Sequence, residues 1–264
     1  MLQGKKIGVT VPTYNEEALI ATTIDNMPPY VDRIYVVNDG STDDTSRIVS
    51  RMCLTNDRLV VINHPANRGV GAAIVTGYKR CLEDDMDIAV VMAGDNQMDP
   101  VELPRLLEPI VSGEVGYSKG NRMSCPEHLK GMPLWRQFGN RLLRWLTGIS
   151  SGNCRVMDPQ NGYTAASAEA LRRIDLDGVY PKYGYCNDLL VKFTVAEVRI
   201  AEVSMPARYL GEKSKIRYRE YIPRVTWLLL GSFAWRVKMA LSFSGQSTRA
   251  TDPAKLATKP QSPV

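Results

Sequence analysis

Residues 7–52 have the sequence IGVTVPTYNEEALIATTIDNMPPYVDRIYVVNDGSTDDTSRIVSRM, in which an apolar run is twice followed by a polar loop and a helical stretch. The apolar runs cover residues 7–11 and 33–37, and the helical stretches cover residues 18–24 and 45–52. Short runs rich in Val and Ile that alternate with helices are typical of parallel strands buried on both faces. This part of the chain therefore predicts an α/β fold.

The same alternation continues to residue 92, with a strand at residues 59–63, a helix at 71–82 and a strand at 88–92. We therefore expect a mostly parallel sheet with helices on both faces. Each strand ends in a polar loop, and sheets of this kind bind ligands at the carboxyl ends of their strands. The loops expected to converge on one site are residues 12–16, 38–41, 64–71 and 94–97.

Beyond residue 110 the alternation of strands and helices weakens. The pattern there predicts helices at residues 135–146 and 165–174 and a strand near residues 195–200. We place the elements that would hold an acceptor substrate in this half of the chain.

The composition disfavours several kinds of site. Only two of the 264 residues are histidine, His64 and His128, so a histidine-rich metal centre is nearly excluded. The five cysteines are widely spaced without a CxxC pair, which argues against a disulfide framework and a zinc site. The net charge is +5, and residues 201–264 carry 11 basic and 4 acidic side chains, or +7, which leaves −2 for residues 1–200. An anionic partner is therefore expected at the C-terminal quarter, and no nucleic acid.

Two short motifs match other enzyme classes. Residues 116–120, GYSKG, fit the G-x-S-x-G pattern of a hydrolase nucleophile, but the only histidine after Ser118 is His128, ten residues away. Residues 69–74, GVGAAI, begin like a dinucleotide-binding fingerprint, but Ile74 stands where the third glycine or alanine would be. We therefore disfavour both a hydrolase and a nicotinamide enzyme.

Asp95 and Gln97 follow the apolar strand end at residues 90–92. With alternate spacing on an extended loop, their side chains point to the same side, so that both oxygens can face one cation. The alternative, which these residues alone leave open, is a polar turn in which Asp99 caps the next helix.

Four blocks of sequence, in their order and spacing, are far more specific than any single one. They are VPTYNEE at residues 11–17, VNDGSTD at 37–43, NRGVGAA at 67–73 and GDNQ at 94–97. Together they resemble glycosyltransferase family 2, and within it the polyprenyl-phosphate sugar synthases typified by dolichyl-phosphate mannosyltransferase. The resemblance covers about residues 5–220 and continues through KGNR at 119–122, DPQNGY at 158–163 and GEKSK at 211–215.

The resemblance implies a GT-A fold, a nucleotide-sugar donor, a divalent cation (Mg²⁺ or Mn²⁺) and an inverting transfer. The residues that match nucleotide-binding positions of the family are Pro12, Tyr14, Glu16, Asp39 and Asp95. Asp95 and Gln97 also match the last two ligands of its metal motif. The first aspartate of that motif falls at Ala93 here, so one carboxylate of the family's metal site is missing.

A lipid monophosphate as acceptor is already ionised near neutral pH and needs no general base. An enzyme for such an acceptor needs cations to hold the phosphate rather than histidines, which fits the scarcity of histidine. Arg122 and Arg208, together with Asp95, are the residues that we expect to act in catalysis. The candidates for binding the acceptor phosphate are Arg122, Arg136, Arg208, Lys213 and Lys215.

We therefore expect an enzyme that moves a hexose or related sugar to a polyprenyl phosphate. A transferase that acts on a hydroxyl of a glycan or lipid is one alternative, and an inactive nucleotide-sugar-binding module that has lost activity through Ala93 is another. Asp188 lies near the place where family members that act on hydroxyls keep a catalytic base. It is either that base or a cap of the following helix, and we favour the structural role.

The segment 222–243 is predicted to contact a membrane. Its densest apolar part, residues 225–235, would span about 16 Å as a helix, too short for a hydrocarbon core of about 30 Å. Trp227 and Trp235 supply interfacial bulk, so we expect a helix that lies in the headgroup plane. The alternative is a helix packed on the catalytic domain.

We therefore predict a GT-A domain at residues 1–220, an amphipathic membrane-interface helix at 221–243 and a disordered tail at 244–264. No stretch of 18 apolar residues occurs, and the N-terminus lacks the apolar region of a signal peptide. These features predict a peripheral protein at the cytoplasmic face of a membrane, with a membrane subunit as a further candidate partner.

Overall fold

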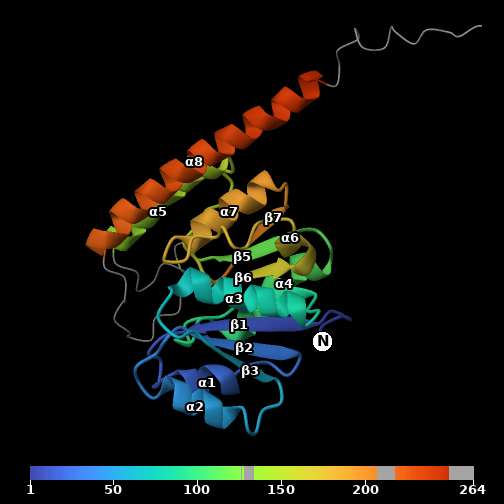
Figure 1. The fold of residues 1–264 in the computed structure, drawn as a ribbon, viewed down its shortest axis with the longest axis vertical. Coiled ribbons are helices and arrows are strands. Elements are labelled where there is room, and N and C mark those ends of the chain that lie inside the picture. Colours follow the sequence, from blue (N-terminus) through green and yellow to red (C-terminus); the bar gives the residue numbers. More distant parts are fainter. Residues whose placement is uncertain (126, 128–133, 207–217, 250–264) are drawn as a thin grey trace, which may run out of the picture.

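The computed structural model describes residues 1–125, 127, 134–206 and 218–249. Within these residues seven strands form one sheet in the order β3-β2-β1-β4-β6-β5-β7 (Figure 1). The strands are β1 (Ile7–Thr13), β2 (Arg33–Asn38), β3 (Leu59–Asn63), β4 (Ile88–Val91), β5 (Tyr117–Asn121), β6 (Thr164–Ser167) and β7 (Ile200–Ser204). All neighbouring pairs are parallel except the two that include β6, so the expected mostly parallel sheet is confirmed.

Helices cover both faces of the sheet (Figure 1). One face carries α1 (Ile20–Asp25), α2 (Thr45–Met52) and α4 (Leu103–Val111), which follows a 3-10 turn at Pro100–Glu102. The other carries α3 (Val70–Glu83), α6 (Ala168–Arg172) and α7 (Tyr185–Val195). Each face of the sheet has its own hydrophobic core. Successive residues of β4 point into both cores, Val90 into the core with α1, α2 and α4, and Val91 into the core with α3, α6 and α7. This burial on two sides explains the continuous apolar runs of the strands.

The elements predicted up to residue 92 agree with the structure to within two residues at each end. Two predictions in the second half were wrong. Residues 165–174, expected as a helix, include most of β6 and the five-residue α6. The strand expected near residues 195–200 begins only at Ile200, because α7 continues to Val195. The small residues of β6 form a strand because β4 and β5 pair with it from either side, and a local pattern does not show such partners.

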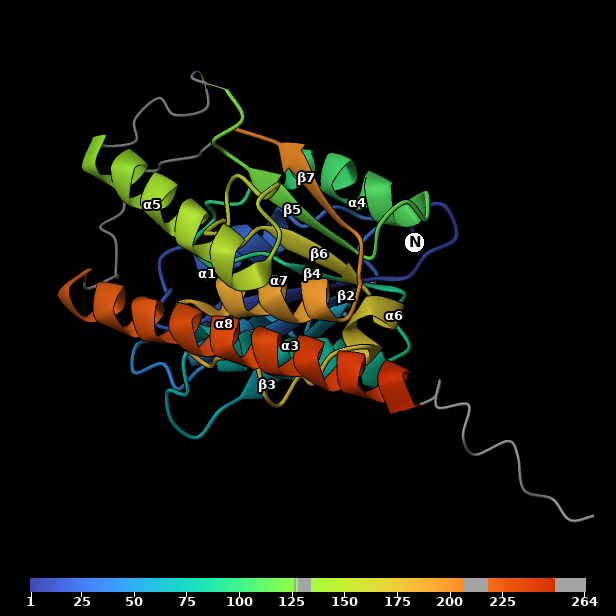
Figure 2. The ribbon, with the colours of Figure 1, turned by 90° about the horizontal axis from the view of Figure 1, so that it is seen from above.

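Two long helices, α5 (Leu134–Ser151) and α8 (Tyr218–Arg249), pack against each other and against α7 (Figure 2). The structure extends α8 beyond the predicted helix of residues 222–243 at both ends, so residues 244–249 of the expected tail are helical. The rest of that tail, residues 250–264, lies outside the described residues. In the described part of the chain, no helix is long and apolar enough to cross a membrane.

The packed side of α8 carries Val225, Leu229 and Ser232, which are buried. From the same side, Arg236 donates hydrogen bonds to carbonyl oxygens in the last turn of α5, from Nε to Ser150 at 2.8 Å and from Nη2 to Ile149 at 3.0 Å. A cation at a helix C-terminus satisfies carbonyls that lack intrahelical partners. The helix is therefore packed on the domain along one side, as the alternative interpretation expected.

Candidate active site

Three adjacent strands, β2, β1 and β4, run parallel and end at the same edge of the sheet. Hydrogen bonds join the loops after β1 and β2. Thr42 N donates to Asn15 Oδ1 at 2.8 Å, and Glu16 N donates to Thr45 Oγ1 at 2.9 Å. Asn15 has a φ of 53°, a left-handed conformation that asparagine tolerates better than most residues. The loops therefore form one connected rim at this edge.

The predicted nucleotide-binding residues occupy different depths of this rim. Pro12 is buried inside β1, where it pairs in register with Val37. Tyr14 is exposed and Glu16 is half-buried. Only Tyr14 and Glu16 of this trio therefore present side chains near the surface, while Pro12 shapes the strand beneath them.

The carboxylate of Asp39 lies deeper and is bound by other groups of the protein. Asp39 is 3% exposed. Its Oδ1 accepts a hydrogen bond from Arg68 N at 2.9 Å and contacts His64 Nδ1 at 2.7 Å, and its Oδ2 accepts from Gly69 N at 2.7 Å. Asp39 thus fixes the loop that leads from β3 into α3, and its direct contact with a nucleotide stays a prediction.

The loop fixed by Asp39 supports a second segment, residues 180–184, which we call the strap. Ala72 N donates to Pro181 O at 3.0 Å. A Cβ added at Gly69 would lie 2.5 Å from the same carbonyl oxygen, and one at Gly71 would overlap the carbonyl oxygen of Tyr180. Close passage of two backbones, rather than a dinucleotide site, therefore explains the glycines of this motif.

Asp188 holds the strap from its other side. Its Oδ2 accepts a hydrogen bond from Tyr180 N at 2.8 Å, and both of its oxygens pair with Lys192 Nζ at 2.8 to 2.9 Å. Asp188 is 6% exposed and lies in the first turn of α7, which has no side-chain cap. The favoured structural role is therefore observed, but the carboxylate binds the strap rather than capping the helix.

The strap carries a residue that the sequence did not single out, Tyr183. Its ring is partly exposed, and its phenol pKa is raised first by partial burial and then by the negative charges of Asp95 and Glu16. The strap therefore brings Tyr183 into the electrostatic range of two predicted donor-site residues. No pattern around residue 183 marks it, because its place depends on the contact between the strap and the turn at residues 69–72.

The extended loop expected at Asp95 and Gln97 is wrong, because the two residues lie in a turn after β4 in which Asn96 has a φ of 57°. Asp95 Oδ1 accepts a hydrogen bond from Gln97 N at 3.1 Å, and Ala93 N donates to the Met98 sulfur at 3.2 Å. Among the described residues, no group of three His, Cys, Asp or Glu side chains could hold a metal ion. Asp95 and Gln97 could supply two oxygen ligands, and a cation at this turn would need the others from a bound substrate or water.

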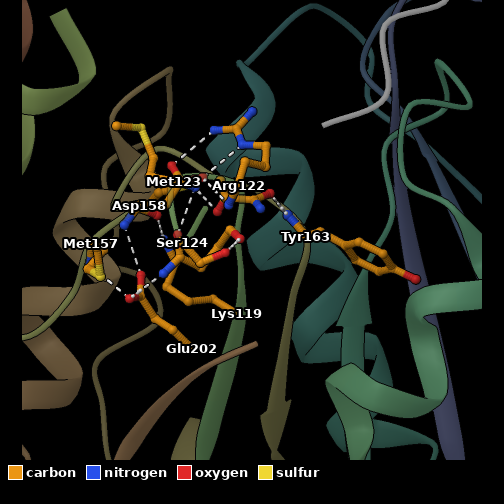
Figure 3. A network of polar contacts seen from close by, with 11 residues as sticks. Lys119, Arg122, Met123, Ser124, Met157, Asp158, Tyr163 and Glu202 are labelled. Carbon is orange, nitrogen blue, oxygen red and sulfur yellow. Dashed lines mark hydrogen bonds and ion pairs between the residues drawn. The ribbon is translucent and has the colours of Figure 1, made fainter. Parts of the chain in front are cut away.

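A second polar cluster surrounds Asp158 (Figure 3). Its carboxylate is buried and accepts from Arg122 Nε at 2.8 Å, Arg122 Nη2 at 3.0 Å and Arg122 N at 3.0 Å. Burial would raise the pKa of Asp158, but the charge and hydrogen bonds of Arg122 lower it below its usual range. The Arg122 side chain is 26% exposed, and Asp158 holds its guanidinium in one orientation.

The loop of residues 158–163 connects the two clusters. At one end Asp158 binds Arg122, and at the other Tyr163 Oη donates to Asp99 O at 3.1 Å, in the loop that follows β4. A Cβ added at Gly162 would lie 3.4 Å from the Met98 methyl group. The structure therefore places Arg122 and the loop of Asp95 at opposite ends of one short segment.

The remaining predicted residues are not all described. Arg136 lies on α5, and Arg208, Lys213 and Lys215 fall outside the described residues. Ser118 is fully buried in β5 and donates its hydroxyl to Leu106 O, so it cannot act as a surface nucleophile and the hydrolase interpretation is rejected.

Comparison with known proteins identifies the family. The model of glycosyl transferase family 2 matches residues 9–179. The chain belongs to glycosyl transferase family 2. It is 31% identical over 218 residues to UDP-N-acetylglucosamine–dolichyl-phosphate N-acetylglucosaminyltransferase of Methanococcus voltae, a match that covers 78% of this chain and 86% of that protein.

A second relative in the family is polyprenol monophosphomannose synthase of Mycolicibacterium smegmatis, 30% identical over 210 residues, which covers 76% of each chain. Among solved structures, glucosyl-3-phosphoglycerate synthase of Mycobacterium tuberculosis, crystallised with Mn²⁺, UDP and phosphoglyceric acid, superposes with a TM-score of 0.64 at 22% identity, covering 88% of this chain and 78% of that one. The protein is therefore a glycosyltransferase with the expected GT-A fold.

Substitution of Gly71 by alanine tests the contact between the strap and the α3 turn. The added Cβ would overlap the Tyr180 carbonyl, so Gly71→Ala should lower the unfolding free energy by about 1–3 kcal/mol. It should also weaken the binding of UDP or GDP, whichever the wild type binds, by displacing the strap. Calorimetric titration and urea unfolding measure both effects.

Gly231→Ala is the matched control, because a Cβ at that position of α8 meets no atom within 4 Å. It should leave nucleotide binding unchanged. Unaltered nucleotide affinity in Gly71→Ala would show that the strap does not shape the donor site.

Proposed function

We propose that the protein transfers a sugar from a nucleotide-sugar donor to the phosphate of a polyprenyl phosphate, forming a lipid-linked sugar. The observation that carries this proposal is the engagement of Asp188, the candidate base, by Tyr180 N and Lys192. His64 is likewise engaged by Asp39. A hydroxyl acceptor needs a base to take its proton, whereas a phosphate monoester is ionised near neutral pH. The described residues therefore suit a phosphate acceptor better than a hydroxyl.

The two relatives support the same acceptor class. Their names specify a dolichyl phosphate and a polyprenol monophosphate, and this chain spans 86% and 76% of their lengths. The names also specify different sugars, N-acetylglucosamine and mannose. The relationship therefore supports a lipid phosphate as acceptor and leaves the donor sugar to experiment.

On the donor side, we place the nucleoside diphosphate at the ends of β1, β2 and β4, beside Tyr14, Glu16 and Tyr183. The carboxylate of Asp95 and the amide oxygen of Gln97 fit Mg²⁺ or Mn²⁺, which prefer oxygen ligands and complete their shell with phosphates and water. When bound, such an ion neutralises the charge that develops on the leaving diphosphate. With Ala93 in place of a third ligand, Asp95 is the one carboxylate that the family motif supplies here.

On the acceptor side, we place the lipid phosphate against Arg122, oriented by Asp158, with Arg136, Arg208, Lys213 and Lys215 as further cations. A phosphate oxygen attacks the anomeric carbon while the bond from that carbon to the diphosphate oxygen breaks. Attack from the face opposite the leaving group inverts the configuration, which is the outcome we propose. A fixed guanidinium stabilises both the attacking anion and its position.

The membrane surface is the third proposed partner. Exposed apolar side chains lie on two helices that pack together, Leu142, Trp145 and Ile149 on α5 and Trp227, Leu230 and Phe233 on α8. Interfacial helices expose such residues to the boundary of headgroups and acyl chains. All five cysteines are unpaired, which fits the reducing cytoplasmic face as the proposed place of action. A membrane subunit is the alternative partner for the same residues.

The acceptor class is tested by offering the protein UDP- and GDP-sugars with either a short polyprenyl phosphate or the matching polyprenol. A lipid-linked product should form with the phosphate and not with the alcohol, because Arg122 supplies a cation for the phosphate while Asp188 and His64, in the described part of the chain, are engaged by other groups. Thin-layer separation of radiolabelled product measures both reactions. A product from the polyprenol would contradict the proposal and favour the hydroxyl alternative, and turnover of any kind would rule out an inactive module.

Asp95→Asn should slow transfer by more than about a hundredfold, since it removes the carboxylate that we propose as a ligand of the cation at the leaving diphosphate. Asp99→Asn is the control, because its side chain accepts from Val101 N and asparagine caps equally well. Initial rates with each variant give the comparison. Activity of Asp95→Asn within about fivefold of wild type would remove Asp95 from the mechanism.

Ala93→Asp restores the carboxylate that the family motif has at this position and should tighten the binding of Mn²⁺ in the presence of nucleotide. A titration of activity against Mn²⁺ should then reach its midpoint at a lower concentration. An unchanged midpoint would show that residue 93 does not face the cation.

Trp227→Glu should reduce sedimentation with anionic vesicles several-fold, because it replaces a 76% exposed indole with a charge that anionic lipid repels. Binding of the wild type should also weaken at high salt. Leu54→Glu, on a residue 84% exposed beyond α2, is the control and should bind like the wild type. Equal binding of both variants would place the membrane contact elsewhere.

A further inference from the structure

All four polar atoms of Asp158 are held by the fold (Figure 3). Its two carboxylate oxygens bind Arg122. Its N–H donates to Glu202 Oε1 at 2.9 Å, and its carbonyl oxygen accepts from Lys119 Nζ. The residue is 1% exposed. The orientation of the Arg122 guanidinium therefore depends on residue 158, whose N–H is held by Glu202 and whose carbonyl oxygen is held by Lys119.

Lys119 and Glu202 are partners in the parallel register of β5 and β7. Partners in register present their side chains to the same face of a sheet, so both reach Asp158 from one side. Lys119 is fully buried, and burial lowers its pKa against the opposing charges of Asp158 and Glu202. A buried lysine that donates to a main-chain carbonyl is a structural group and not a surface cation awaiting an anion.

Glu202 binds the two segments next to Arg122, which are residues 157–158 and residue 121. Besides the Asp158 N–H, its Oε2 accepts from Met157 N at 2.8 Å and from Asn121 Nδ2 at 3.1 Å. Asn121 in turn accepts from Met123 N through Oδ1 at 2.8 Å. One carboxylate thus joins the turn that carries Asp158 to the turn that carries Arg122.

We infer that Glu202 is a positioning residue for the acceptor phosphate, which acts through Asp158 and Asn121 on the guanidinium of Arg122. This inference rests on the proposed function, since it assumes that Arg122 binds the lipid phosphate. In these contacts the carboxylate of Glu202 binds groups of the protein itself. Its effect is to hold a reacting partner within a narrow range of positions, on which the rate of a displacement depends strongly.

Glu202→Gln is the sharpest variant, because it changes one oxygen to an NH₂ group without changing the shape. Oε1 accepts one backbone N–H and Oε2 accepts another, so either orientation of the amide leaves a backbone N–H facing a donor. Glu114→Gln, the same change at an exposed position before β5, is the control. Binding of a short polyprenyl phosphate without donor is measured by calorimetry, together with binding of the nucleoside diphosphate.

The Glu202→Gln variant should bind the lipid phosphate about tenfold more weakly, with nucleotide affinity within about twofold of wild type. In an Arg122→Ala background, the same substitution should change lipid-phosphate binding by less than about twofold, because its route of action is gone. Glu114→Gln should resemble wild type in all measurements. Retained nucleotide binding and a cooperative melt show that each variant is folded.

Two results would overturn the inference. One is an equal effect of Glu202→Gln with and without Arg122, and the other is a parallel loss of nucleotide affinity that marks a general structural defect. Failure of the proposed function appears separately in the wild type, as absence of binding or transfer to the lipid phosphate, and would overturn both.

Discussion

A carboxylate that is removed from water must be matched by hydrogen-bond donors, because an unmatched buried charge costs on the order of several kcal/mol. In the described part of the chain, Asp39, Asp158 and Asp188 meet this constraint at 3%, 1% and 6% exposure. Each is matched in part by backbone N–H groups of a loop: residues 68–69, residue 122 and residue 180. The loops that build the site are therefore held in place by carboxylates of the fold beneath them.

The proposed site spans two parts of the sheet. The parallel strands β3, β2, β1 and β4 carry the loops that we assign to the donor, and β5 and β7 carry the cluster that we assign to the acceptor. The loop of residues 158–163 lies between the two, since it binds Arg122 at one end and contacts the carbonyl of Asp99 at the other. A displacement reaction needs its two reactants held at a fixed separation. With donor and acceptor bound where we propose, this loop links the two binding sites.

A strand can be predicted from the sequence when its buried residues are apolar, and is missed when its buried residues are polar. The strands up to residue 92 are apolar runs, so their pattern alone predicted them, and the role of the motif around Asp95 at the donor stays a prediction. β5 has the sequence YSKGN, and every residue of it is buried, including Lys119. Polar residues are buried there because the carbonyl oxygens of Leu106 and Asp158, 12 and 39 residues away along the chain, accept hydrogen bonds from Ser118 and Lys119. Tyr183 and Glu202 escaped prediction for the same reason, since their roles depend on contacts made only in the folded chain.

We propose that the acceptor nucleophile is a phosphate oxygen, and a ³¹P spectrum of the complete reaction distinguishes this nucleophile from a hydroxyl group. The phosphomonoester signal of the polyprenyl phosphate should be replaced by a phosphodiester signal while free nucleoside diphosphate appears in equal amount. Consumption of the nucleotide sugar with an unchanged phosphomonoester signal would contradict the proposal, because the sugar would then have been transferred to a hydroxyl group or to water.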